Sequence, residues 1–252
     1  MQCYAQSEWT GNRLLVAMAC RSNILPVEKT IPVIHSLKNM KHLEVAFLEN
    51  CSCNASINEV SFFLGTVEQH TLNNAPWTGY EYKPKVNFAM AYGTDCLFLK
   101  YYVSETFLRA ANGAKNSAVY EDSCVEFFIS FENDKSYYNF EFNCIGTCLI
   151  GYGESKTDRM LLPEALISKV KYQAVISNQL AGDDIHWELT VNIPFSVFCY
   201  HKLKEVKGKN CRANFYKCGD VLPTPHFISW SPIHWPEPNF HLPECFGSLL
   251  FV

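Results

Sequence analysis

Two neighbouring stretches of the chain, Tyr120–Phe131 and Tyr137–Asn143, carry carboxylate and amide side chains at alternate positions. The polar residues that repeat with this period are Glu126, Ser130, Asn139, Glu141 and Asn143. Because successive side chains of a β-strand point to opposite faces of a sheet, these groups would share one face and large apolar residues the other. The pattern predicts two adjacent strands with an apolar back and a front face suited to hydrogen bonding. This front face is the candidate functional surface.

A later stretch could extend the same face, since Arg212, Asn214 and Tyr216 also alternate. Sugars stack their C–H faces on aromatic rings and pair their hydroxyls with carboxylates, amides and arginine. A sheet face with these groups, in a chain that is 14% aromatic, therefore fits a carbohydrate-binding surface. The alternative is a solvated sheet face whose charges prevent aggregation.

The tryptophans differ in their expected roles. Trp187 is in phase with apolar residues of a strand and is expected in the core. Trp77 precedes the first clear hairpin in a loop, where it would act either as a packed lid or as a ligand platform. Trp230 and Trp235 lie in a loop punctuated by prolines, which would stiffen a stacking surface.

Catalysis is a second interpretation of the same residues. Glu126 and Glu141 on adjacent strands could form the acid–base pair of a glycoside-processing enzyme. A metal or proton-transfer site could instead draw on five residues near the C-terminal end, His226, His234, Glu237, His241 and Glu244. The sequence contains no GxSxG, HExxH, P-loop or dinucleotide signature, which favours a non-catalytic domain. A third interpretation is a protein-interaction domain without sugar binding.

The elements that must position these residues are short alternating runs separated by turn residues. Residues 86–92 and 96–103 form a predicted hairpin across Gly93–Asp95, and residues 167–176 and 186–193 form another across Ala181–Asp184. Helical signals are restricted to residues 103–111, 163–167 and 195–200. The chain is therefore expected to be all-β, an antiparallel, jelly-roll-like β-sandwich with a few short helices, forming one domain over residues 40–252.

Composition excludes several partner classes. A net charge of −4 without a long basic run argues against nucleic acid, and no apolar stretch approaches the length of a membrane helix. The 12 cysteines are scattered and lack paired CxxC spacing, so we expect mostly reduced, packed thiols rather than disulfides or a zinc ribbon. We expect a monomer.

The first 39 residues are weakly patterned, and we expect an extension that is either not native or disordered. Met40 is a plausible natural start, which would leave no export signal and favour a cytoplasmic location. The run Arg13–Cys20 leaves open a short lipoprotein signal, with a periplasmic protein anchored through Cys20.

Several segments resemble carbohydrate-binding modules of family 9. The segment Val119–Phe128 resembles the acidic-aromatic strand of that family, Tyr137–Asn143 with Gly146 and Thr147 resembles the strand that follows, and Trp187–Phe195 resembles a late strand. The C-terminal segments resemble a compact, single-domain subgroup known mainly from Bacteroidetes-type genomes; they are Arg212–Asp220, His226–Pro232 and Asn239–Gly247.

The resemblance implies a β-sandwich that binds a mono- or oligosaccharide between two aromatic rings, linked to polysaccharide breakdown. Tyr120 stands where the family has one stacking Trp, Glu126 matches a Glu that grips the sugar, and Trp230 is the candidate second ring. Asn139 and Glu141 replace an Arg and an Asn of the family, and Arg212 and Asn214 complete the predicted ligand-binding set. Calcium occurs in the family, and no set of metal ligands for it stands out here.

Overall fold

The computed structural model describes residues 6–10, 13–17, 40–49, 51–132, 134–178 and 184–252. The chain divides into two compact units, Met1–Lys38 and Asn39–Val252. In the first unit, strand β1 (Gln6–Thr10) pairs antiparallel with β2 (Arg13–Ala17). Cys20, the proposed lipid anchor, lies outside the described residues, as does most of the expected turn at Ala181–Asp184.

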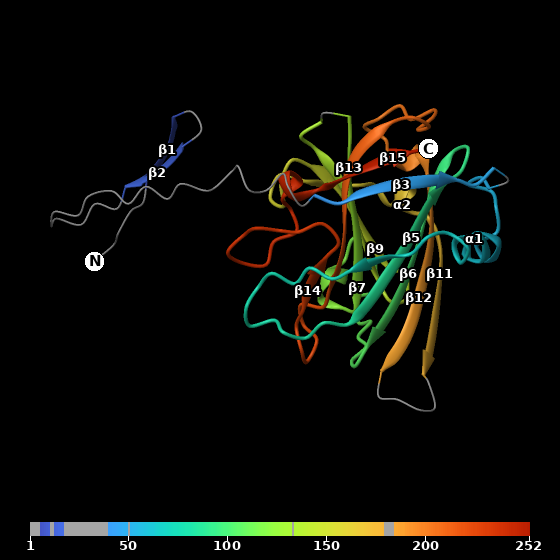
Figure 1. Ribbon diagram of the computed structural model, residues 1–252, viewed down its shortest axis with the longest axis horizontal. Coiled ribbons are helices and arrows are strands. Elements are labelled where there is room, and N and C mark those ends of the chain that lie inside the picture. The colour runs from blue at the N-terminus through green and yellow to red at the C-terminus, as the bar shows by residue number, and fades with distance from the viewer. Residues whose placement is uncertain (1–5, 11–12, 18–39, 50, 133, 179–183) are drawn as a thin grey trace. The chain divides into compact units, whose positions relative to one another are not determined.

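The second unit is a β-sandwich whose strands run through two layers (Figure 1). The first layer contains β10, β9, β8, β7, β13 and β15 in spatial order, with β14 beside β13. Its bounds are β7 (Cys124–Phe131), β8 (Tyr137–Asn143), β9 (Cys148–Gly153), β10 (Met160–Leu161), β13 (Asn210–Cys218), β14 (Phe227–Ser229) and β15 (Gly247–Phe251).

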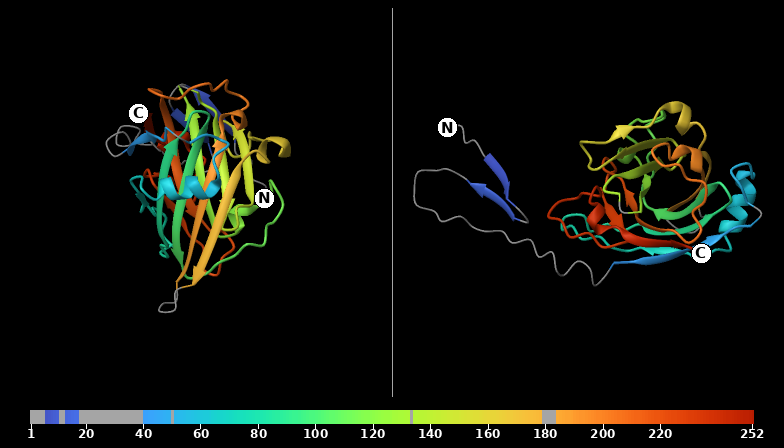
Figure 2. Two further views of the ribbon diagram at one scale, coloured as in Figure 1. Left: turned by 90° about the vertical axis from the view of Figure 1, so that its right-hand side faces the viewer. Right: turned by 90° about the horizontal axis from the view of Figure 1, so that it is seen from above.

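The second layer contains β5, β6, β12 and β11, with β4 beside β5. Its bounds are β4 (His70–Leu72), β5 (Lys85–Tyr92), β6 (Cys96–Glu105), β11 (Lys171–Asn178) and β12 (Ile185–Pro194). Strand β3 (His42–Phe47) joins the layers by pairing with β15 on one side and with β5 on the other. Seen from above, the strands curl around a common interior (Figure 2).

The predicted all-β sandwich is confirmed, with one difference in strand direction. The ladders are antiparallel except for the two made by β3, which is parallel to both β15 and β5. The expected hairpin forms, with Tyr92 opposite Leu97 across Gly93–Asp95. A Cβ at Gly93 would lie 2.2 Å from the carbonyl oxygen of Cys51, so the turn requires a residue without a side chain.

Helices are few, and their positions differ partly from those expected. The structure has α1 (Ile57–Leu64), α2 (Glu164–Ile167) and single 3-10 turns η2 (Val119–Glu121), η3 (Phe195–Val197) and η4 (Pro243–Cys245). The sequence analysis missed α1, whose Ser56 and Glu59 form a reciprocal capping box. The helical signal at 103–111 is wrong, because β6 continues to Glu105 and an irregular segment follows. None of the described helices is long and apolar enough to cross a bilayer.

The main core fills the space between the two layers. Val125, Phe127 and Ile129 of β7 pack there with Leu97 and Leu99 of β6, all without solvent exposure. The predicted alternation of β7 is confirmed, since its other residues face away from this core. Helix α1 packs on the outside of the second layer, where Val60 and Leu64 contact alanines of β5. The polar residues of β7 therefore lie on the face of the first layer that points away from the main core.

Candidate functional site

The front face of the first layer forms as the alternation predicts. Strands β7 and β8 pair with Glu126 directly opposite Glu141. On the other side of β7, Tyr216 of β13 stands opposite Glu126. The side chains that were predicted to share a face are thus brought side by side.

Most of this face is covered rather than solvated. The segment from Ile233 to Phe246 crosses it and, together with Trp77, forms a second apolar cluster with Phe128 and Tyr216. Phe240 stacks on Tyr216 at a centroid distance of 4.2 Å, and the Trp77 indole donates to the Trp235 carbonyl at 2.9 Å. Of its two predicted roles, Trp77 takes that of a packed lid, with 6% of its surface exposed.

A pocket of about 70 Å³ remains open at the end of the face where Glu126 and Glu141 meet. Its acidic, basic and amide lining consists of Glu126, Glu141, Lys156, Arg159, Asp220, Asn239 and His241. Three aromatic rings complete the walls: Tyr120 from η2, Phe227 from β14 and Phe240 from the covering segment. The pocket therefore combines flat apolar surfaces with buried hydrogen-bonding groups.

Arg159 and Asn139 fix the Glu141 carboxylate. The Arg159 Nη1 and Asn139 Nδ2 atoms donate to Glu141 Oε1 at 2.7 and 2.8 Å. Burial raises the pKa of Glu141, and the charge of Arg159 acts in the opposite direction. Its second oxygen, Oε2, is buried and has no hydrogen-bond partner among the described residues. Leaving a buried acceptor unpaired costs about 1–3 kcal/mol of folding free energy. A ligand hydroxyl that donates to this oxygen would offset that cost.

Glu126 differs from Glu141 in the charged groups that surround it. It lacks an arginine partner, and burial followed by the charge of Glu141 raises its pKa well above the ordinary value. The Cys218 thiol donates to its Oε1 at 3.1 Å. Of the two carboxyl groups, Glu126 is therefore the one whose surroundings more strongly favour the protonated form, while Arg159 favours the charged form of Glu141.

Two further groups add to the electrostatics of the pocket. Asp220 is exposed as a residue, yet desolvation of its carboxyl group raises its pKa to about 6. His241 accepts or donates a hydrogen bond with the Tyr137 hydroxyl at 2.8 Å, and burial lowers its pKa to about 3. His241 is therefore neutral at neutral pH and leaves Lys156 and Arg159 as the cations of the site.

Of the seven predicted ligand-binding residues, Tyr120, Glu126 and Glu141 line the pocket. Asn139 does not line the pocket; it lies beside Glu141 on the same face of β8 and donates to its carboxylate. Arg212 and Asn214 do not line the pocket, because their side chains form hydrogen bonds with backbone atoms instead. Arg212 donates to the carbonyls of Asp134 and Pro243, and Asn214 donates to the carbonyl of Ser231 and accepts from its N–H.

The expectation for Trp230 is wrong. Side chains alternate between two faces along the short strand β14 and into the residue after it. Phe227 therefore faces the pocket, while Ile228 and Trp230 face the main core. The Trp230 ring is 2% exposed and lies edge-on to Phe215 at 5.5 Å. A Cβ at Gly247 would approach this ring to 2.6 Å, so the glycine makes room for it. Phe227, which is half-buried, takes the place expected for the second ring.

Arg159 is the most important residue that the sequence analysis missed. It follows β9, whose last residues are Gly151-Tyr-Gly153. A Cβ at Gly153 would lie 2.6 Å from Arg159 Cα, and one at Gly151 would lie 3.2 Å from Arg159 Cδ. The two glycines let the arginine chain fold back over β9 and reach Glu141. The closely spaced glycines before a charged turn are the signal that could have indicated it.

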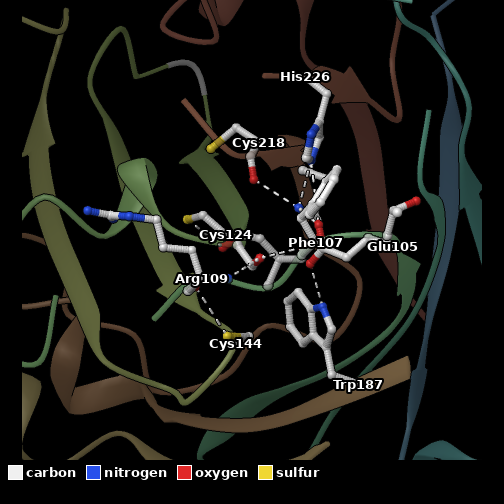
Figure 3. A network of polar contacts seen from close by, with 12 residues as sticks. Glu105, Phe107, Arg109, Cys124, Cys144, Trp187, Cys218 and His226 are labelled. Atoms are coloured by element: carbon white, nitrogen blue, oxygen red, sulfur yellow. Dashed lines mark hydrogen bonds and ion pairs between the residues drawn. The ribbon is translucent and has the colours of Figure 1, made fainter. Parts of the chain in front are cut away.

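A separate polar network lies behind the pocket, within the main core (Figure 3). The Lys217 ammonium contacts Glu105 Oε2 at 2.8 Å and His226 Nε2 at 2.7 Å, and the Trp187 indole donates to Glu105 Oε1 at 2.7 Å. The predicted core position of Trp187 is confirmed. The histidines near the C-terminal end do not assemble into a site, since His226 is buried here, His241 lines the pocket and His234 is exposed.

Comparison with known proteins identifies the family and supports the fold. The family model described as carbohydrate-binding family 9 matches residues 59–251. A crystal structure from Bacteroides uniformis, named as a candidate carbohydrate-binding protein, is 38% identical with a TM-score of 0.77 and covers 84% of this chain and 100% of its own. No curated protein sequence gives a match.

Two structures of a family 9 carbohydrate-binding module from Caldicellulosiruptor kristjanssonii, in complex with cellotriose and with glucose, share the fold. Each is 13% identical and covers 84% of this chain, with TM-scores of 0.52 and 0.50 and with 93% and 96% of the module matched. The match of the family model over most of the chain, and the fold and pocket that accompany it, lead to one conclusion: this chain belongs to carbohydrate-binding family 9.

Proposed function

We propose that the pocket binds one terminal sugar residue of a glycan noncovalently, with glucose or a β-linked glucose oligomer as the first ligand to test. Tyr120 and Phe227 supply the rings on which the C–H face of the sugar stacks. Glu141 and Arg159 pair with its hydroxyls, and Glu126 donates a hydrogen bond from the floor. All of these residues come from one chain, so a monomer suffices.

The unpaired Glu141 Oε2 carries this proposal. It is a buried acceptor on a pocket wall, and its carboxylate is oriented by Arg159 and Asn139 before any ligand arrives. Preorganised groups of this kind lose little conformational entropy on binding. The sugar ligands of the Caldicellulosiruptor module support the choice of glucose and cellotriose as probes.

Isothermal titration with glucose and cellotriose tests the proposal. In Tyr120→Ala we expect affinity to fall about 2- to 12-fold, because an aromatic stacking contact contributes about 0.5–1.5 kcal/mol. The protein should remain folded, since Tyr120 is only partly buried.

Trp230→Phe is the matched control, because Trp230 packs in the core and not in the pocket. It should lower the free energy of unfolding by about 1–3 kcal/mol and leave the sugar affinity unchanged. Equal affinities for Tyr120→Ala and the unmodified chain would contradict the proposed site, as would a loss of affinity in Trp230→Phe.

A further inference from the structure

Two cysteines face each other at the floor of the pocket. Cys124 begins β7 and Cys218 ends β13, and the two residues are directly opposite in the antiparallel ladder. Both side chains point to the front face, and Glu126 lies two residues after Cys124 on the same face. Figure 3 shows the two sulfur atoms turned to the same side of the neighbouring strands.

These three side chains have the spacing of metal ligands. One sulfur from each cysteine and one carboxylate oxygen of Glu126 all lie within 4.8 Å of one another. Cys218 Sγ and Glu126 Oε1 are 3.1 Å apart. A tetrahedral Zn²⁺ with Zn–S bonds of about 2.3 Å holds its ligand atoms about 3.5–3.8 Å apart. Small side-chain rotations would therefore bring all three onto one ion.

The composition of the group selects the kind of ion. Two thiolates and a carboxylate favour a thiophilic divalent cation such as Zn²⁺ over Ca²⁺ or Mg²⁺, which prefer oxygen ligands. Within the part of the chain that the structure describes, no other set of three histidine, cysteine or acidic side chains has this spacing. Of the remaining described cysteines, Cys53 donates to Asp95 and Cys199 is exposed, while the others are buried.

The site adjoins the pocket, although its three side chains are themselves buried. Cys218 and Glu126 line the pocket, and so does Asp220, whose carboxyl group contacts the Cys218 thiol. An ion held by the three ligands would direct its fourth coordination position toward the pocket opening, where water can enter. Three protein ligands with one open position is the arrangement typical of non-structural zinc sites.

We propose that Cys124, Cys218 and Glu126 bind one thiophilic divalent cation of the Zn²⁺ class at the floor of the pocket, with water in the fourth position. Binding releases the protons of both thiols, and that of Glu126 where it is protonated, to solvent as the metal–ligand bonds form. Nothing is oxidised or reduced. The metal site shares Glu126 with the proposed sugar site, and a metal-bound Glu126 carboxylate would accept rather than donate a hydrogen bond. The test below measures the metal alone, so its outcome does not depend on sugar binding.

Titration of the metal-free chain with Co²⁺ under a reducing agent tests the site. We expect one equivalent to produce the near-ultraviolet thiolate-to-cobalt charge-transfer band and the visible bands of tetrahedral Co²⁺, and Zn²⁺ to abolish both. Cys124→Ser and Cys218→Ser should each weaken Co²⁺ binding about 100-fold or more, since each removes a direct ligand. The control Cys211→Ser lies on the same strand as Cys218 but faces the core, and should bind like the unmodified chain.

A second measurement uses the unmodified chain and does not depend on how the variants fold. Cys124 and Cys218 are buried, so an alkylating agent reaches them only when the fold opens locally. One equivalent of Zn²⁺ should slow the alkylation of two thiols, and peptide mapping should identify them as Cys124 and Cys218. An unmodified chain that gives no charge-transfer band, or protection of any other pair, would overturn the proposal. So would a Cys211→Ser variant that loses the Co²⁺ bands as completely as Cys218→Ser.

Discussion

Lys217 has no solvent exposure, although a buried ammonium group is costly unless it is fully paired. Its position follows from the alternation of β13, where it is in phase with the core residues Ala213 and Phe215. The charge is stabilised by Glu105, the Cys218 carbonyl and the neutral ring of His226. The network therefore requires an unprotonated histidine, because a second cation would face Lys217 at 2.7 Å.

This requirement makes stability depend on pH. Burial, and then the charge of Lys217, lower the pKa of His226 to about 3 from 6.5. Below pH 6.5 His226 is protonated in the unfolded chain and stays neutral in the folded chain. The free energy of unfolding therefore decreases as the pH falls. Between pH 6.5 and about pH 5 we expect His226 to cost about 2 kcal/mol of unfolding free energy.

Urea unfolding at about pH 7 and about pH 5 measures this effect. His226→Gln should be less stable at neutral pH and show a smaller loss on acidification. His234→Gln, which changes an exposed histidine, should retain the loss of the unmodified chain. An equal loss in all three proteins would show that His226 does not control the acid response.

The same alternation explains which site residues could be predicted from sequence. The sheet face on which Glu126, Glu141 and Asn139 lie could be predicted, because side chains alternate between the two faces of a strand and the sequence identifies these strands clearly. The role of Asn139 as a support for Glu141 was not predictable, because it depends on Arg159 returning over β9. Trp230 was misplaced because a three-residue strand, β14, resembles a loop in the sequence.

At the scale of elements, the segment that covers the front face shapes the pocket. It contributes Phe240 and His241 to the walls, and it has little regular structure of its own beyond η4. Asn214 anchors the chain just before this segment. It makes two hydrogen bonds with the backbone of Ser231, at 2.8 and 3.2 Å. Asn214 and Ser231 are both fully buried, so water cannot replace these bonds.

Asn214→Ala should therefore lower the free energy of unfolding by about 1–3 kcal/mol. It leaves the buried Ser231 N–H without its acceptor, while the Ser231 carbonyl keeps only the hydroxyl of Ser229 as a donor. Sugar affinity should fall as well, since the pocket walls lose their anchor. Asn87→Ala is the matched control, as its side chain accepts from Thr71 on a partly exposed strand. Chemical denaturation and titration with cellotriose measure the two effects, and similar losses in both variants would argue against an anchoring role.

No sequence pattern indicates where this covering segment lies. Its prolines and turn residues predict an irregular path, and its apolar residues predict some packing. Which face it covers is decided by contacts with residues that are distant in sequence, such as Trp77 with Trp235. Arg212 and Asn214 were accordingly expected to contact ligand, whereas Arg212 contacts this segment at Pro243 and Asn214 contacts Ser231, two residues before it.

At the scale of the whole molecule, all the pocket residues and all the core residues belong to the unit from Asn39 to Val252. A chain that begins at Met40 should unfold at the same temperature as the full chain and bind cellotriose with the same affinity. Differential scanning calorimetry and titration compare the two proteins. A lower unfolding temperature in the shortened chain would mean that the first 39 residues stabilise the sandwich.

The overall class was predictable, because many short alternating strands with little helix leave few alternatives to a sandwich. The order of strands was not, since β3 and its neighbour β15 are separated by about 200 residues and nothing local specifies their parallel pairing.

That pairing has a consequence for biosynthesis. Strand β3 is among the first parts of the sandwich to leave the ribosome, and its partner β15 is among the last. Until residues 247–251 emerge, β3 and β13 both expose unpaired backbone edges to the crowded interior of the cell. The nascent chain therefore carries two unpaired strand edges until the end of translation, and such edges are sites where polypeptides aggregate.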